Sequence, residues 1–319
     1  MTGTIEIATS YVTIDGAVSN GIQVIMQNPS GSAYVGVGGT SAPTHNVTLR
    51  YIEVAGPCGS TPCHNLGDHR SFVIEHWNGS DYDTQDSWLL QYMNFHGACN
   101  NMVLYGETNL VIEHSRLADS LDSVGDICHP NVGNIGGGTA TFRYNEVVNW
   151  DTEGLMFLGT GTWYIYGNIW HDPSTSSYPR YLESQTNNML VYSYNNTLAN
   201  IPYGTVLTSN GGTWSSSSQG RNNIYWNTNG TGGFSSDDYD FSNVSLSETH
   251  GQGKASNPFV SLTGENYHLT AHTNAGLSLG SPYNVDYDGN TRTTWDRGAY
   301  EFATGISPNP PTNLTGTAH

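Results

Sequence analysis

Leu49-Arg50-Tyr51-Ile52-Glu53-Val54 is the stretch that decides the fold, because its pattern of apolar and polar residues returns along the chain. Further copies begin at Leu90, Ile112, Phe142, Tyr164 and Val191, and a last copy ends at Asn223-Ile224. The last positions of neighbouring copies are 41, 22, 30, 22, 28 and 27 residues apart. A strand pattern with this period predicts a solenoid, in which each coil buries its apolar face by stacking on its neighbours.

Two apolar columns support this prediction. The last position of the repeat is occupied by Val54, Phe95, Leu117, Val147, Ile169, Thr197 and Ile224. A second strand, after a turn, has Val103, Ile127, Met156, Leu182 and Val206 at its third position. Like residues of stacked parallel strands lie about 4.8 Å apart, so both columns are expected to face the core.

Polar residues stand just before the first column. Asn168, Asn196 and Asn223 predict an asparagine ladder at a turn, where stacked amides satisfy one another and the backbone. Two pairs of opposite charge occupy neighbouring positions and predict cross-coil ion pairs on the outer surface, each worth little by itself. These pairs are Arg116 with Glu146 and Glu113 with Arg143.

The C-terminal part carries a succession of motifs. They are Asn257-Pro258-Phe259-Val260, Tyr267-His268-Leu269, the run 284–292 and the run 296–302. This succession resembles the end of secreted right-handed parallel β-helix proteins of the pectate-lyase-like superfamily. The resemblance implies an all-β chain with one right-handed parallel β-helix over residues 1–304. The group includes lyases, hydrolases, epimerases and non-enzymes, so it implies no single activity.

Residues 305–319 differ in amino-acid composition from the coils. They are rich in proline and contain Thr312-Asn313-Leu314-Thr315, which resembles the start of a fibronectin-like module. We predict a linker or a truncated module of that kind.

The charge balance restricts the partners. The formal net charge is −18, from 27 acidic and 9 basic residues. Such a chain repels nucleic acid and anionic lipid, and it repels polyanionic polysaccharides unless Ca²⁺ or a local arginine intervenes. No apolar run approaches the roughly 20 residues that span a bilayer, so we expect no membrane insertion. The oligomeric state is left open.

Four cysteines point to an oxidising compartment and thus to a secreted protein. Cys58 and Cys99 each stand four residues after a repeat, so they are candidates for a bond across coils. Cys63 and Cys128 would then pair, or Cys58 and Cys63 would close a small loop instead. A zinc site is the less favoured alternative, because the spacing contains no CxxC unit.

Most acid–base groups lie between Asp119 and Glu183. Asp119, Asn149 and His171 follow the first column at equal spacing and predict a polar strip on adjacent coils. Near them in sequence are Asp122, Asp126, His129, Asp151, Glu153, Asp172, Arg180, Tyr181 and Glu183. This concentration is the candidate site.

Two chemistries suit these residues. A glycoside hydrolase needs two carboxylates facing one bond, and the candidates are Asp119, Asp126, Asp151, Glu153 and Glu183. A polysaccharide lyase needs a base and a group that neutralises the uronic carboxylate. His129 or His171 would be the base, with Arg180 and Tyr181 as substrate or acid groups. Asp119, Asp122 and Asp126 would hold Ca²⁺.

We therefore predict a secreted carbohydrate-active protein, a polysaccharide lyase or glycoside hydrolase that acts on an extracellular polysaccharide. The alternative is a non-catalytic surface, adhesion or structural module, because no complete catalytic motif is present. Trp150, Trp163, Trp170 and Tyr178 would either stack on sugar rings or cover the flank of the solenoid.

Overall fold

The computed structural model describes residues 5–25, 35–37, 43–58, 70–75, 82–121, 129–174 and 178–303. Within these ranges the regular structure is β-strand, and no helix is present that is long and apolar enough to cross a membrane.

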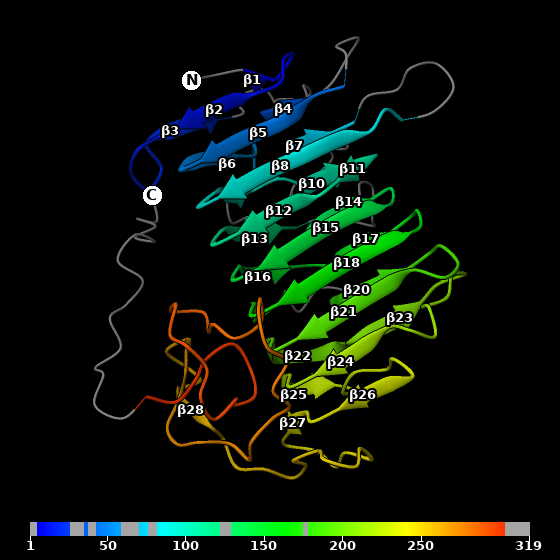
Figure 1. Cartoon of the computed structure of the whole chain (residues 1–319), viewed down its shortest axis with the longest axis vertical. Helices are drawn as coiled ribbons and strands as arrows, with labels where there is room; N and C mark the ends of the chain where they lie inside the picture. Colours follow the sequence, from blue (N-terminus) through cyan, green and yellow to red (C-terminus); the bar gives the residue numbers. More distant parts are fainter. Residues whose placement is uncertain are drawn as a thin grey trace.

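Three parallel sheets run along one axis (Figure 1). The first sheet contains β1 (Ile5–Glu6), β4 (Val35–Val37), β7 (Arg70–Ile74), β10 (Asn100–Leu104), β14 (Gly133–Ile135), β17 (Glu153–Phe157), β20 (Arg180–Ser184) and β23 (Leu207–Ser209). The second contains β2 (Val12–Asp15), β5 (His45–Arg50), β8 (Gln85–Gln91), β12 (Leu110–Glu113), β15 (Gly138–Arg143), β18 (Gly161–Tyr166), β21 (Leu190–Tyr194), β24 (Gln219–Arg221) and β26 (Ser236–Asp238), with β11 (Glu107–Thr108) beside β8. The third contains β3 (Ile22–Ile25), β6 (Ile52–Ala55), β9 (Asn94–His96), β13 (Arg116–Ser120), β16 (Glu146–Trp150), β19 (Ile169–His171), β22 (Thr197–Thr205), β25 (Ile224–Asn229) and β27 (Phe241–Ser242).

Neighbouring strands in each sheet come from successive coils and pair in parallel, as in β12 with β15 and β13 with β16. The predicted all-β parallel β-helix is therefore confirmed. A small antiparallel sheet of β28 (Phe259–Ser261) and β29 (Asn266–Leu269) follows the coils.

Each copy of the sequence repeat contains two strands rather than the one that was predicted. β5 ends at Arg50 and β6 begins at Ile52, so Tyr51 alone forms the bend between the second and third sheets. Its φ of 57° is left-handed, and Tyr92, His114 and Tyr144 adopt the same conformation in later coils. A bend of one or two residues leaves no run of turn residues, which is why the pattern looks like a continuous strand.

The position of the bend also shows that some residues were wrongly assigned to the first apolar column. In the fifth copy of the repeat the bend residue is Gly167, so Trp170 rather than Ile169 stacks on Val147. Val54, Phe95, Leu117 and Val147 lie in the core as predicted. Ile169, Thr197 and Ile224 instead face outward, in register with Glu146.

The residues of the second predicted column do not all face the core: some lie on the outer face of the first sheet. Met156 is in register with Asn134 and Glu183, and it alternates with the core residues Leu155 and Phe157. It therefore lies on the outer face, as does Val103, which is in register with Asn134. Leu182 and Val206 lie in the core as predicted. Ile127 lies outside the described residues.

The asparagine ladder is confirmed and is longer than predicted. The backbone N–H of Asn168 donates to Asn196 Oδ1 at 3.0 Å, and that of Asn196 donates to Asn223 Oδ1 at 3.0 Å. Asn145 precedes them, and the buried carboxyl of Asp240 ends the ladder by accepting from the Asn223 N–H at 2.7 Å. The ladder pins the register of successive coils.

Both predicted cross-coil ion pairs are present. Arg116 Nε lies 3.1 Å from Glu146, and Arg143 Nε donates to Glu113 at 2.6 Å. The backbone N–H of Cys58 donates to Gly97 O, which places Cys58 and Cys99 on neighbouring coils. Neither is a free thiol, but their pairing stays a prediction because Cys63 and Cys128 lie outside the described residues.

Residues that follow the last coil pack against the outer face of the third sheet. Phe259, Tyr267 and Tyr300 form a second hydrophobic core with coil residues such as Ile169 and Ile224. This segment runs beside the lower coils (Figure 1). It explains why Ile169 and Ile224 are apolar although they face away from the main core. Residues 305–319 lie outside the described part of the chain.

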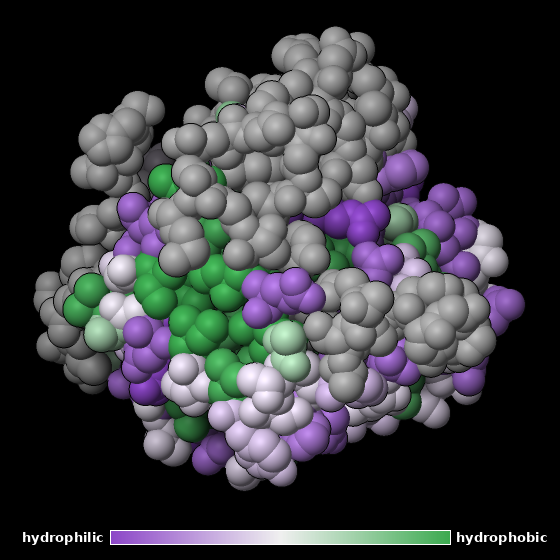
Figure 2. Space-filling view, turned by 90° about the horizontal axis from the view of Figure 1, so that it is seen from above, coloured by the Kyte–Doolittle hydropathy of each residue, from purple (hydrophilic) through white to green (hydrophobic). Residues whose placement is uncertain are grey.

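Figure 2 shows the N-terminal end of the solenoid. Among the coloured side chains, apolar ones gather together and hydrophilic ones lie around them. Ile5, Ile14 and Ile22 of the first coil are partly buried against the main core.

Candidate functional site

The predicted site residues divide between two places on the solenoid. His171 lies on the outer face of the third sheet, under the C-terminal segment. Glu153, Arg180 and Glu183 lie on the first sheet. We call the first place the histidine cluster, which contains Glu146, His171, Asp172, Glu265 and Tyr267. We call Glu153 and Glu183, with Arg180 between them, the acid pair.

In the histidine cluster, both ring nitrogens of the fully buried His171 contact carboxylates. Nδ1 lies 2.9 Å from Asp172 and Nε2 lies 3.1 Å from Glu146. Burial alone lowers the pKa of His171, but the hydrogen bonds to Asp172 and Glu146 outweigh it and raise the pKa to about 9. His171 is therefore an imidazolium at neutral pH and has no free nitrogen to accept a proton.

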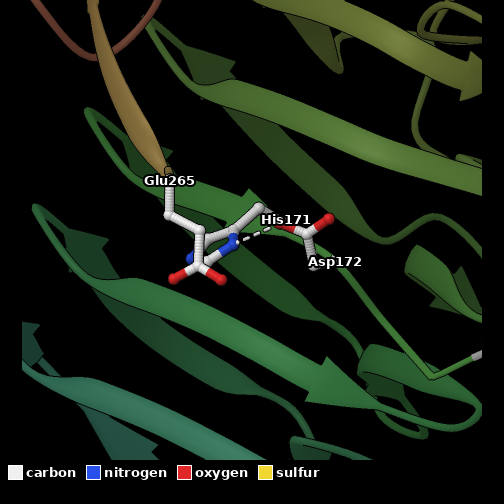
Figure 3. A group of neighbouring side chains, drawn as sticks. All are labelled: His171, Asp172 and Glu265. Carbon is white, nitrogen blue, oxygen red and sulfur yellow. Dashed lines mark hydrogen bonds and ion pairs between the residues drawn. The ribbon is translucent and has the colours of Figure 1, made fainter. Parts of the chain in front are cut away.

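The C-terminal segment closes this cluster. The Tyr267 hydroxyl donates to Asp172 at 2.9 Å, and its ring lies 5.0 Å from the His171 ring. Glu265 comes from the same segment and directs its carboxylate toward His171 (Figure 3). The ligand-type atoms of His171, Asp172 and Glu265 lie within 4.8 Å of one another. A metal ion would need a neutral His171 with a free lone pair, so this group suits an ion-pair network better than a metal.

The prediction of His171 as an accessible base is therefore wrong. The composition of the polar strip also differs from the prediction: Asp172, rather than His171, follows Asp119 and Asn149 in it. The Asn149 side chain donates to Asp119 at 2.6 Å, and that of Asn200 donates to Asp172 at 2.8 Å. Gly167 is the equivalent of Tyr144, so the sequence alignment placed this copy one residue early, as in the apolar column.

We expect His171→Gln to loosen the C-terminal segment. The folded-state pKa of about 9 lies above the ordinary value near 6.5. The ion pairs therefore stabilise the fold fully below pH 6.5, by about 3 kcal/mol, and this contribution is lost as the pH rises through 9. Urea unfolding at pH 6 and pH 9.5 measures the effect, which should be large for wild type and small for the variant.

His250→Gln is the matched control, because His250 contacts Asp238 at 2.8 Å but is half exposed. Equal losses of stability at pH 6 for the two variants would show that the buried histidine cluster stabilises the fold no more than the half-exposed pair of His250 and Asp238.

The acid pair consists of two glutamates on adjacent coils that share one arginine nitrogen. Arg180 Nη1 lies 2.9 Å from Glu153 Oε1 and also donates to Glu183 Oε2. The other Glu183 oxygen accepts from the Gln185 side chain at 2.7 Å and from Asn210 at 3.4 Å. Charged and amide donors around Glu183 suit an ionised carboxylate.

The start of β20 is irregular, and this orients the arrangement. The carbonyl of Val206, just before β23, accepts from the N–H groups of both Tyr181 and Leu182, at 3.0 and 3.2 Å. Tyr181 and Leu182 both enter the core, and Arg180 and Glu183 on either side of them meet outside it.

Tyr181 is accordingly not a site residue, which corrects its predicted role. It is fully buried, its ring lies 4.9 Å from that of Trp170, and its hydroxyl bonds to Ser193. Trp150, Trp163 and Trp170 are also core residues rather than sugar platforms. Tyr178 is 68% exposed.

The two carboxyls of the acid pair differ in environment. Burial, and then the charge of Glu183, raise the pKa of Glu153 to about 6. The exposed side-chain fractions are 24% for Arg180, 10% for Glu153 and 1% for Glu183. Solvent thus reaches the pair from the Arg180 side, and a ligand must displace the guanidinium to contact both carboxylates.

The remaining predicted residues fall around the pair or outside the described chain. The exposed His129 precedes β14, and its carbonyl accepts from Asn131. Asn131 Oδ1 in turn accepts from the Thr152 hydroxyl and the Glu153 N–H. Asp151 is buried, and its N–H donates to Ser120.

Of the predicted calcium ligands, Asp119 bonds to Asn149, while Asp122 and Asp126 lie outside the described residues. The sequence prediction also missed Gln185, Asn210 and Asn131, which contact the acid pair. Only the strand register of β14, β17, β20 and β23 brings them there.

Neither a protein-family model nor a curated protein matches the sequence. Among solved structures, the chain is similar to pectate lyase Pel9A, with a TM-score of 0.48 and 14% identity over 95% of this chain and 86% of that one. A likeness at this level carries no functional argument, so the fold rests on the sheet topology and the site on its own geometry.

Proposed function

We propose that the protein is a glycoside hydrolase that cleaves an extracellular polysaccharide at the acid pair. The observation that carries the proposal is that Glu153 and Glu183 contact the same nitrogen of Arg180 while the pKa of Glu153 is raised to about 6. Two neighbouring carboxyls, one of them with a raised pKa that suits it to act as the acid, are the arrangement that glycoside hydrolysis needs.

The other predicted bases support a lyase less well. A lyase must remove a carbon-bound proton, but His171 has both nitrogens engaged and Tyr181 is buried in the core. Arg180 contacts two carboxylates, and a guanidinium is not deprotonated in proteins. His129 is the base that a lyase would have to use.

In the proposed reaction, Glu153 acts as the acid and Glu183 as the nucleophile. Glu153 gives its proton to the glycosidic oxygen, and Glu183 attacks the sugar to form a glycosyl-enzyme. Water then hydrolyses that bond with Glu153 as base. Two carboxylates that contact one nitrogen suit the retaining spacing of about 5–5.5 Å better than the inverting one, which leaves room for water. The expected products are saturated and retain their anomeric configuration.

The experiment is to incubate the chain with neutral and uronic polysaccharides, with Ca²⁺ and with chelator, and to analyse the products by mass spectrometry and NMR. Saturated fragments with retained configuration are expected, with kcat/KM falling above about pH 6 as Glu153 loses its proton. Unsaturated fragments would establish a lyase instead. Loss of activity with chelator would support calcium at Asp119, Asp122 and Asp126, which stays a prediction, as does secretion.

The second candidate is a non-catalytic extracellular module. The pairing of charged groups in the histidine cluster favours it, because such a network needs no substrate to explain it. Binding without cleavage of any polymer would decide for this alternative.

A further inference from the structure

We propose that the outer face of the first sheet binds an uncharged polysaccharide, and that the exposed rings of Tyr178 and Tyr203 stack on its sugar units. This inference names the substrate class for the proposed function and rests on the same site. Three independent features of the described residues support it: the side chains beside the acid pair, the state of the cations in the sheet, and two exposed aromatic rings.

Amide side chains predominate beside the acid pair. Asn134 is half-buried in the outer column that also contains Met156 and Glu183. Gln185 and Asn210 are exposed, and both donate to Glu183. Amide groups donate and accept at once, which matches the hydroxyl groups of a neutral sugar.

No strand of the first sheet offers an unpaired cation within the described ranges. Arg70 and Arg180 are the two basic residues in its strands. Arg70 contacts Glu75 at 2.7 Å, and Arg180 bridges the acid pair. A uronic acid polymer would bring a carboxylate to each sugar unit of a chain whose net charge is −18. Its binding would need positive groups that this face already uses.

Two exposed aromatic rings lie where the chain passes from the third sheet to the first, Tyr178 just before β20 and Tyr203 near the end of β22. Tyr178 stands two residues before Arg180 and is 68% exposed, and Tyr203 is 53% exposed. They lie on adjacent coils, because Gly204 approaches the Pro179 carbonyl so closely that a Cβ at this position would collide with it. Exposed aromatic rings offer an apolar face and a polar edge, which suits the faces and hydroxyls of sugar rings.

The test is affinity electrophoresis of the full chain in gels that contain galactomannan, hydroxyethylcellulose or xylan, with polygalacturonate and alginate gels beside them. We expect retardation by at least one neutral polymer and by neither polyuronate. Tyr178→Ala and Tyr203→Ala should each weaken that binding about tenfold. Tyr11→Ala is the matched control, because Tyr11 is 76% exposed on the first coil, away from the acid pair. Circular dichroism checks that all three variants are folded.

The outcomes separate this inference from the proposed hydrolase. Binding to a neutral polymer without cleavage would keep the inference and reject the hydrolase. Cleavage of a polyuronate alone would do the reverse. Retardation in no neutral gel, or equal losses of binding for Tyr11→Ala and the two site variants, would overturn the inference.

Discussion

Glutamine in place of Glu183 is expected to lower kcat on a cleaved polysaccharide by at least about 10³-fold, because the amide cannot attack the sugar. The side chain keeps its size, and its amide oxygen can still accept from the side chains of Gln185 and Asn210, while the bond from Arg180 is lost. The loss should therefore appear in kcat, with folding and substrate binding largely kept. Steady-state kinetics on the polymer found in the product assay measure it.

Glu153→Gln should behave differently, because Glu153 supplies the proton rather than the nucleophile. Its loss should be about 10²–10⁴-fold on a polysaccharide and much smaller on an aryl glycoside, whose leaving group needs no proton. The fall in kcat/KM above pH 6 should also disappear.

Glu113→Gln is the matched control for both variants. Glu113 is a buried carboxylate that contacts Arg143 across coils, as Glu153 contacts Arg180, but it lies on the second sheet. An equal loss of activity in this variant would mean that broken ion pairs, rather than lost chemistry, explain the effect. Full activity in Glu183→Gln would remove the acid pair as the site.

The largest effect on stability is expected at Glu107. This residue of β11 is 1% exposed, and neither carboxyl oxygen has a hydrogen-bond partner among the described residues. Burial raises the pKa of Glu107 from 4.5 to about 8, so the folded protein holds a proton that the unfolded chain releases. At 1.36 kcal/mol for each pKa unit, this costs about 3 kcal/mol of stability at pH 7.

Glu107→Gln removes the ionisable group and should recover most of that stability at pH 7. Since the folded-state pKa is the higher one, wild type should lose stability relative to the variant as the pH rises from 4.5 to 8, and the difference should then level off. Thermal unfolding from pH 4 to pH 9 gives the comparison. The exposed Glu6 of β1 supplies the control variant Glu6→Gln. Parallel stability curves for wild type and Glu107→Gln would show that Glu107 is ionised in the folded state.

The sequence by itself determined the solenoid. Stacked coils place like residues on like, so the repeat, the asparagines at 168, 196 and 223, and the two cross-coil ion pairs were all readable as columns. Glu153, Arg180 and Glu183 were also among the predicted site residues, because acid–base groups concentrate in that part of the chain. The solenoid, the asparagine ladder and the cross-coil ion pairs were predicted well because they depend only on the spacing of the repeat.

Only the tertiary structure decided which of those residues meet. The left-handed bend is the third residue of the first four copies but the fourth residue, Gly167, of the copy that begins at Tyr164, and this one-residue difference places His171 outside the polar strip and Trp170 in the core. Two consecutive residues of β20, Tyr181 and Leu182, entered the core, Arg180 met Glu183 outside it, and the C-terminal segment closed over His171. One-residue shifts of this kind leave no trace in composition or spacing, yet each one transfers a side chain to the other face of its strand.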